Sequence, residues 1–307
     1  MDGPCAIRSG RRRPSLPGLS LPRSVRHLLE HGLFRIAGAT FRGLGLQRAS
    51  AVSGLLWRVG APLLKRHGRA LGHLAASLPD TTAAEREAIA RAMWENLGRT
   101  FAEAFFLREI AAEGRVDESN RAVLEAWLDW PGGKVACAAH LANWELAVAP
   151  AQAERVDLWS IYQTLKNPRV DADVHAMRAF LYRGGLVAKG PGVPRQFLKV
   201  VRDGGAVALL SDLRDYTGVA VPFLGRPAPS TTFPALLAVA AGAPVLVCCM
   251  RRLPGVRFLQ TYTLIAMPDT GDRAADVAQV TAEIQAVFDG FVRRWPEQWM
   301  WAHRRWG

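Results

Sequence analysis

Residues 134–145 of the chain, KVACAAHLANWE, join a short apolar run to a polar turn. The run Lys134–Ala139 has the length of a buried strand, and a helical pattern starts at Asn143. Strands that alternate with helices predict an α/β fold with a mostly parallel central sheet flanked by helices, in which ligands bind beyond the carboxyl ends of the strands. The same alternation continues downstream, and we expect strands at 158–162, 186–188, 206–211, 219–223, 244–250 and 257–264, and helices at 170–183, 194–202, 230–241 and from Asp272 onward.

A long helix is predicted before this region. Thr82 and Glu85 have the spacing of a capping box, and apolar residues follow at intervals of four from Ile89 to Phe105. This pattern predicts a helix over about 82–110. We therefore assign residues 71–307 to a single α/β domain.

Composition limits the class of protein. The 307 residues are 50% hydrophobic, which is enough for a large core without disulfide or metal support. The net charge is +12, and the first 70 residues hold 13 basic and 2 acidic side chains, so the excess lies almost entirely there. A basic N-terminal quarter suggests contact with a polyanion, either nucleic acid or an anionic membrane surface. Because the body is nearly neutral, nucleic-acid binding is not expected.

Several cofactor and metal sites lack their motifs. The four cysteines form no C-x-x-C pair, and the chain contains no H-E-x-x-H, P-loop, G-x-G-x-x-G or G-x-S-x-G sequence. We expect no metal and no cofactor.

The N-terminal segment divides into a flexible basic leader, residues 1–22, and two amphipathic helices within residues 23–70. Neither helix is long or charge-free enough to span a bilayer. One interpretation places both helices in the membrane interface, with Trp57 at the polar boundary. The other interpretation is a pair of ordinary amphipathic helices packed on the body.

His140 and Glu145 are the candidate chemical groups. A histidine at the end of a strand can deprotonate an alcohol when a carboxylate fixes its other ring nitrogen, and a spacing of five across a strand-to-helix turn allows that contact. Asn143 can cap the following helix. By spacing alone, a histidine with a glutamate five residues later is common and favours a structural histidine.

Several ordered sequence blocks resemble one family. HLANWE at 140–145 resembles the H-x4-[D/E] block of the lysophospholipid acyltransferase superfamily, in particular its lipid A biosynthesis (late) acyltransferase branch. Similar blocks follow at 160–168 (SIYQTLKNP), 211–212 (SD), 221–228 (VPFLGRPA), 242–245 (GAPV) and 296–306 (PEQWMWAHRRW). The chain departs from the branch at Ala142, where glycine is usual, and at Leu213, where glutamine is usual.

The resemblance implies a glycerolipid acyltransferase-like fold and an activity. The enzyme would move a fatty acyl chain from an acyl carrier protein thioester to a hydroxyl of a lipid A precursor of the Kdo-lipid IVA type, at the cytoplasmic face of the bacterial inner membrane. His140 would act as general base and Glu145 would orient the imidazole. The candidate substrate-binding residues are Asn143, Lys166, Asn167, Arg178, Asp212, Gly225 and Arg226, with the arginines on acceptor phosphates because a guanidinium binds phosphate bidentately.

The implied partners are acyl carrier protein, the lipid A precursor and the anionic membrane surface, with peripheral or monotopic attachment. Two alternatives remain open. One is the sister branch that acylates phosphatidylinositol mannosides from acyl-coenzyme A, and the other is a membrane-surface lipid-binding protein of the same fold without catalytic activity.

Overall fold

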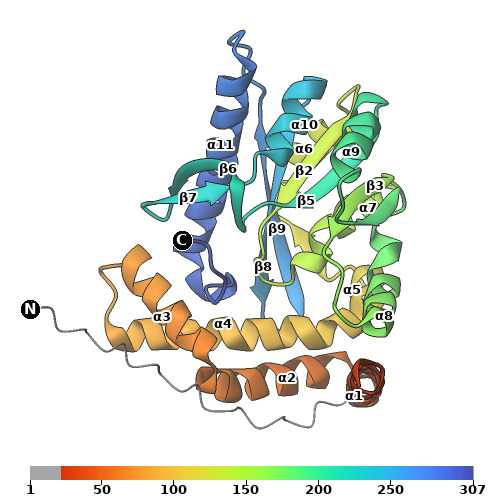
Figure 1. Cartoon of the computed structure of the whole chain (residues 1–307), viewed down its shortest axis with the longest axis vertical. Helices are drawn as coiled ribbons and strands as arrows, with labels where there is room; N and C mark the ends of the chain where they lie inside the picture. The colour runs from red at the N-terminus through yellow and green to blue at the C-terminus, as the bar shows by residue number, and fades with distance from the viewer. Residues whose placement is uncertain (1–21, 307) are drawn as a thin grey trace, which may run out of the picture.

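A computed structural model describes residues 22–306, so the predicted leader lies outside the described residues except for its last position. The chain forms an α/β fold around a seven-stranded sheet in the order β1-β9-β8-β2-β5-β3-β4 (Figure 1). The strands from β8 to β4 run parallel, whereas β9 pairs antiparallel with β8. The strands of the sheet are β1 (Val116–Glu118), β2 (Lys134–Ala138), β3 (Leu158–Tyr162), β4 (Gly185–Ala188), β5 (Ala206–Leu210), β8 (Val245–Leu253) and β9 (Arg257–Ile265).

Helices cover both faces of the sheet and one of its ends. The helices are α1 (Arg23–Leu44), α2 (Leu46–Gly60), α3 (Lys65–Ser77), α4 (Ala83–Glu103), α5 (Leu107–Ala112), α6 (Arg121–Leu128), α7 (Ala149–Ala153), α8 (Pro168–Arg178), α9 (Val193–Arg202), α10 (Phe233–Ala241) and α11 (Arg273–Arg294). Short 3-10 turns are η1 (Ala61–Leu63), η2 (Ala104–Phe106), η3 (Trp144–Val148), η4 (Ala179–Leu181) and η5 (Pro296–Gln298).

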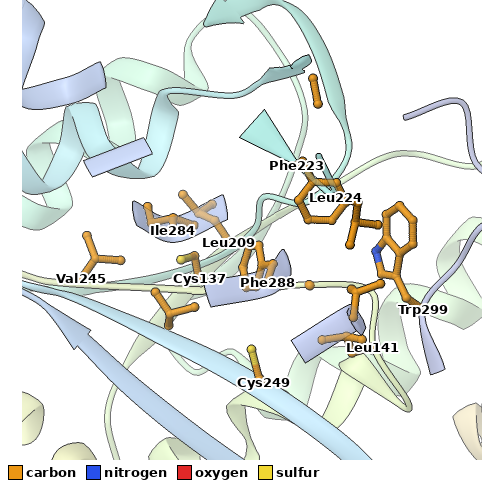
Figure 2. Close-up of a cluster of buried hydrophobic side chains, with 14 of the residues drawn as sticks. Cys137, Leu141, Leu209, Phe223, Leu224, Val245, Cys249, Ile284, Phe288 and Trp299 are labelled. Carbon is orange, nitrogen blue, oxygen red and sulfur yellow. The ribbon is translucent and has the colours of Figure 1, made fainter. Parts of the chain in front are cut away.

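The alternation of side chains along β2 separates two buried clusters. Val135 and Cys137 point into a cluster with residues of α9, α10 and α11, part of which Figure 2 shows around Ile284 and Phe288. Ala136 and Ala138 point to the opposite face, against a cluster that includes residues of α6 and α7. A strand that is buried on both faces has no polar side to its pattern, which is why its sequence reads as a continuous apolar run.

The N-terminal helices form a layer of their own. Figure 1 shows α4 crossing one end of the sheet, with α2 packed along the opposite side of α4. Small residues make this contact, since the Ser53 hydroxyl donates a hydrogen bond of 2.6 Å to the Gly98 carbonyl oxygen. A Cβ atom on Gly98 would lie 2.7 Å from the Ser53 carbonyl oxygen, so no larger residue fits at that position.

Many aliphatic residues of α1 and α2 face solvent, whereas the aromatic side chains Phe34, Phe41 and Trp57 pack against rings of α4 and η2. Where the inner side of α2 is small and partly polar, leucines lie on the outer side, and Leu55 and Leu56 are 60% and 65% exposed. The exposed apolar side chains of this layer, which we call the apolar face, are Val25, Leu28, Leu29, Leu33, Ile36, Leu44, Val52, Leu55, Leu56, Val59, Leu63 and Leu64.

The apolar face bears on both interpretations of the N-terminal segment. Leu55, Leu56 and the other residues of the apolar face are exposed, although α2 itself packs on the body against α4. The Trp57 ring is half-buried and packs 6.2 Å from Trp94 and 6.1 Å from Phe101, measured between centroids, and its place at the polar boundary stays a prediction. Among residues 22–306, no helix has the length and apolar character needed to cross a membrane.

The α/β prediction is confirmed, and so is the capping box at Thr82 and Glu85, where both reciprocal hydrogen bonds are present. The long helix predicted over about 82–110 consists of α4, which ends at Glu103, followed by the 3-10 turn η2 and the short helix α5. Two expectations were wrong in detail. The helix expected from Asn143 is the 3-10 turn η3 followed by α7, and the predicted strand 219–223 belongs to a separate antiparallel hairpin of β6 (Arg214–Phe223) and β7 (Arg226–Ser230).

Candidate active site

His140 and Asp212 meet at the carboxyl edge of the sheet. β2 and β5 are parallel neighbours, so the residues that follow them lie side by side. The His140 Nδ1 atom lies 2.7 Å from Asp212 Oδ1, and the His140 backbone N–H donates to Asp212 Oδ2 at 3.0 Å. The Trp299 indole N–H donates to the same Oδ2 at 2.8 Å. Asp212 is fully buried, whereas 14% of the His140 side chain is exposed.

This environment favours a charged imidazole. Burial opposes that charge, but the Asp212 carboxylate and its hydrogen bond hold the pKa of His140 above its ordinary value. Burial likewise opposes ionisation of Asp212, but His140 and the Trp299 N–H keep the pKa of that carboxyl below its usual value. Because Asp212 occupies Nδ1, the Nε2 atom of His140 is the ring nitrogen left for a substrate.

Glu145 does not make the predicted contact with the imidazole. It lies on η3, where its carboxylate pairs with Arg178 at 2.6 Å and accepts the Trp144 indole N–H at 3.0 Å. The Trp144 ring itself lies 5.0 Å from the His140 ring, centroid to centroid. Asp212, a predicted substrate ligand, thus makes the contact with His140 Nδ1 that the sequence predicted for Glu145. The reason is topological, because β5 brings its carboxyl end next to that of β2, whereas the tight turn η3 leads Glu145 toward α8.

Two further predicted substrate ligands have internal partners. The Asn143 side chain is fully buried and donates to Glu103 at 3.0 Å, so it does not cap the following turn. Asn167 caps α8 by accepting the Arg169 N–H at 3.1 Å, and it donates to the His27 carbonyl oxygen of α1 at 2.8 Å. Lys166 beside it is exposed.

Gly225 and Arg226 lie at the β6–β7 hairpin. Leu224 and Gly225 form its two-residue turn with φ of 51° and 74°, the left-handed conformation that favours glycine. The Arg226 guanidinium stacks on the Trp306 ring at 4.4 Å, and its Nη1 atom is buried without a hydrogen-bond partner in the described structure. Arg226 therefore keeps a donor for a ligand.

Sequence reasoning missed two kinds of residue. Trp299 lies in the last sequence block that resembles the family, at 296–306, but the sequence did not predict its contact with Asp212. Glu103 and Arg252, which form a buried ion pair behind Asn143, belong to no motif that we could identify. Within residues 22–306, no group of three or more His, Cys, Asp or Glu side chains is arranged to hold a metal ion.

A parallel α/β sheet with a buried imidazole–carboxylate pair at its carboxyl edge defines a protein suited to proton transfer with a hydroxyl-bearing ligand. The family comparison makes this class specific. The family model of the bacterial lipid A biosynthesis acyltransferases matches residues 25–307, nearly the whole chain, and the protein belongs to that family. No curated protein matches the chain in a sequence comparison.

Proposed function

We propose that the protein transfers a fatty acyl chain from an acyl carrier protein thioester to a hydroxyl of a lipid A precursor of the Kdo-lipid IVA type. The His140–Asp212 pair carries this proposal, because it supplies a base with a free Nε2 atom at the edge where α/β proteins bind ligands. Membership of the lipid A acyltransferase family supports the acceptor class. The same geometry gives the protein a catalytic role rather than a purely lipid-binding one.

The reaction follows from the proton path. His140 Nε2 accepts the hydroxyl proton as the acceptor oxygen attacks the thioester carbon, and Asp212 stabilises the imidazolium through Nδ1–H. The tetrahedral intermediate then expels the thiolate, which accepts that proton from Nε2. The hydroxyl proton therefore ends on the carrier thiol, and no covalent acyl-enzyme is required.

Arg226 and Arg178 are the proposed contacts for acceptor phosphates. Arg226 has the unused buried Nη1 donor, which a phosphate oxygen can satisfy. Arg178 is held at the site by Glu145, so its guanidinium is oriented before the substrate arrives. Glu145 acts here on Arg178 and on the charge around His140.

The apolar face is the proposed membrane-binding surface. Twelve large apolar side chains are exposed on α1, α2 and the segment after α2, and soluble monomers rarely leave a large apolar surface uncovered. Arg42 at the end of α1 can contact anionic headgroups. These side chains support peripheral attachment to a membrane, and we propose the cytoplasmic face of the inner membrane as its place.

The experiment is acyl transfer from labelled acyl carrier protein to a lipid A precursor by wild type, His140→Ala and His67→Gln. His67 is a matched control, because its Nε2 atom pairs with Glu87 at 2.9 Å between α3 and α4, far in sequence from the strand ends. We expect label on the precursor with wild type and His67→Gln and none with His140→Ala. Transfer that survives in His140→Ala would refute the mechanism.

Two further arms distinguish the substrates. Acyl-coenzyme A replaces the carrier protein in one, and a phosphatidylinositol mannoside replaces the precursor in the other. Label on the mannoside alone would move the protein to the sister activity, and no transfer to either acceptor would leave a lipid-binding protein.

A further inference from the structure

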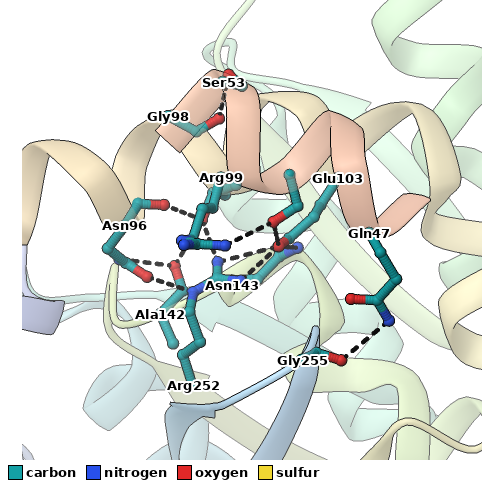
Figure 3. A network of polar contacts seen from close by, with 12 residues as sticks. Gln47, Ser53, Asn96, Gly98, Arg99, Glu103, Ala142, Asn143, Arg252 and Gly255 are labelled. Atoms are coloured by element: carbon teal, nitrogen blue, oxygen red, sulfur yellow. Dashed lines mark hydrogen bonds and ion pairs between the residues drawn. The ribbon is translucent and has the colours of Figure 1, made fainter. Parts of the chain in front are cut away.

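A buried polar cluster lies behind the turn that carries His140. Figure 3 shows side chains of α2, α4 and β8 converging on the loop after β2. Glu103, which is fully buried, is the centre of this cluster. Its carboxylate accepts the Ser50 hydroxyl at 2.7 Å and the Asn143 side-chain N–H at 3.0 Å, and it forms an ion pair with Arg252.

The cluster fixes the backbone as well as the side chains of the loop. The carbonyl oxygen of Ala142 accepts the Thr100 hydroxyl at 2.9 Å and the Asn96 side-chain N–H at 3.3 Å. The Ala142 N–H donates to the Gln298 carbonyl oxygen at 3.0 Å. These contacts hold Ala142 at φ 50°, a conformation that alanine rarely adopts, and a strained residue persists only where its surroundings determine it.

Arg252 joins the parts of the cluster. Its Nε atom donates to Asn96 at 2.7 Å, and its Nη2 atom donates to Thr100 at 3.1 Å and to Glu103 at 2.9 Å. Its backbone N–H donates to Gln298 at 2.6 Å. Arg252 thereby connects the two segments that hold Ala142, because its guanidinium binds α4 and its backbone N–H binds Gln298 of η5. Removing a charge from such a pair leaves the other charge buried and alone.

The other end of the cluster is α2, the helix whose outer side carries much of the apolar face. Ser50 is on its inner side and is fully buried against Glu103. Ser50, Glu103 and Asn143 therefore connect α2 to the His140 loop. The links from Ser50 to Glu103 and from Glu103 to Asn143 are both direct hydrogen bonds.

We infer that Glu103 and Arg252 are positioning residues for the acyl transfer, which hold residues 140–143 so that His140 faces Asp212 with Nε2 free. This inference rests on the proposed role of His140 as the base. Neither residue contacts the reacting atoms. Their loss therefore changes the rate through the orientation of the imidazole, and misplacement of a catalytic group by about 1 Å costs about 10²-fold in rate.

The experiment compares Glu103→Gln and Asn143→Ala with Glu95→Gln. Asn143→Ala removes only the contact that joins Glu103 to the loop and keeps the Glu103–Arg252 ion pair intact. Glu95→Gln is the matched control, because Glu95 also joins α4 to α2, through Arg58 at 3.1 Å, and pairs with Arg99 at 2.6 Å, but contacts neither Glu103 nor the loop. The measurements are kcat, KM, thermal midpoint and the ¹⁵N shifts of the His140 ring nitrogens.

We expect Glu103→Gln and Asn143→Ala to lower kcat about 10²-fold with KM nearly unchanged, and Glu95→Gln to keep the wild-type rate. The ring-nitrogen shifts of His140 should show Nδ1–H in wild type and Glu95→Gln, and a mixture of tautomers in Glu103→Gln and Asn143→Ala. If Glu103→Gln fails to fold, Asn143→Ala decides alone.

Wild-type kcat and wild-type ring-nitrogen shifts in a folded Asn143→Ala variant would overturn the inference. So would an equal loss of kcat in Glu95→Gln, because that result would show a general effect of the helix pair. The nitrogen shifts need no substrate. If wild type transfers no acyl group, the proposed function fails, and the shifts still decide whether the cluster positions His140.

Discussion

Replacement of Asp212 by asparagine distinguishes the role of Asp212 from that of Glu145, the other carboxylate near His140. The two oxygens of Asp212 have different tasks, since Oδ2 accepts two N–H groups, from the His140 backbone and Trp299, while Oδ1 faces His140 Nδ1. An asparagine in this site keeps its single oxygen where two donors converge. Its NH₂ group then faces Nδ1, which must become an acceptor. The ring proton moves to Nε2, and the imidazole can no longer take the proton of a hydroxyl.

The wrong tautomer sets the magnitude of the loss. A serine protease with the corresponding change loses about 10⁴-fold in kcat for this reason, and we expect a loss of about 10³- to 10⁴-fold here. The pH profile should shift as well. The carboxylate holds the pKa of His140 above its ordinary value, so its removal lowers that pKa, and the acid limb of kcat/KM moves to lower pH.

Glu145→Gln is the comparison variant. Its carboxylate contacts Arg178 and Trp144, so the change breaks an ion pair beside the imidazole without altering the tautomer. Loss of about 1 kcal/mol from that pair predicts a fall of about fivefold in rate. Steady-state acyl transfer at several pH values, with thermal midpoints to verify folding, measures both variants. A larger loss of kcat in Glu145→Gln than in Asp212→Asn would refute the assignment of Asp212 and restore the pairing that the sequence spacing suggested.

Three further predictions follow from other parts of the structure. Ala142→Gly should change the free energy of unfolding by less than about 1 kcal/mol, because relief of its positive φ offsets the loss of a buried methyl group. Ala142→Val should lower the free energy of unfolding by more than about 2 kcal/mol, and thermal denaturation measures both variants. Leu55→Ser combined with Leu56→Ser should weaken co-sedimentation with anionic vesicles by at least about 10²-fold, because each leucine loses about 1.5–3 kcal/mol of burial, and unchanged binding would exclude this face. Arg305→Ala should lower the free energy of unfolding by about 3 kcal/mol, measured with urea, because it leaves the Pro229 carbonyl oxygen and the Gln285 side-chain oxygen without their buried donor.

Much of the fold was predictable because its strands have strong local signals. β3 begins and ends where the apolar run predicted, and Asp272 caps α11 by accepting the Ala274 and Ala275 N–H groups. β7 was missed because Pro227 and Pro229 disfavour a strand, and it survives only as one side of a two-stranded hairpin. β1 was missed because it has only three residues.

The site was predictable in its base and not in the partner of that base. His140 follows a strand within a recognisable block, so its place at the sheet edge could be foreseen. Its contact with Asp212 spans 72 positions and depends on β5 lying next to β2, an order of strands that a single sequence does not reveal. Spacing favoured Glu145 because it was near in sequence, and tertiary pairing overrode that proximity.

The pattern of α2 explains why Leu55 and Leu56 face outward. Around Ser53 its inner side lies so close to α4 that only small residues fit, as the contact between Ser53 and Gly98 shows. That closeness also brings the Ser50 hydroxyl within hydrogen-bond distance of Glu103. A leucine in place of Ser50 or Ser53 would force the helices apart and remove this contact, so Leu55 and Leu56 lie on the outer side, whereas Trp57 packs against Trp94 and Phe101 of α4 beside the close contact. The same pattern therefore produces both the apolar face and the buried cluster behind His140, and a change that repacks α2 should affect vesicle binding and catalytic rate together.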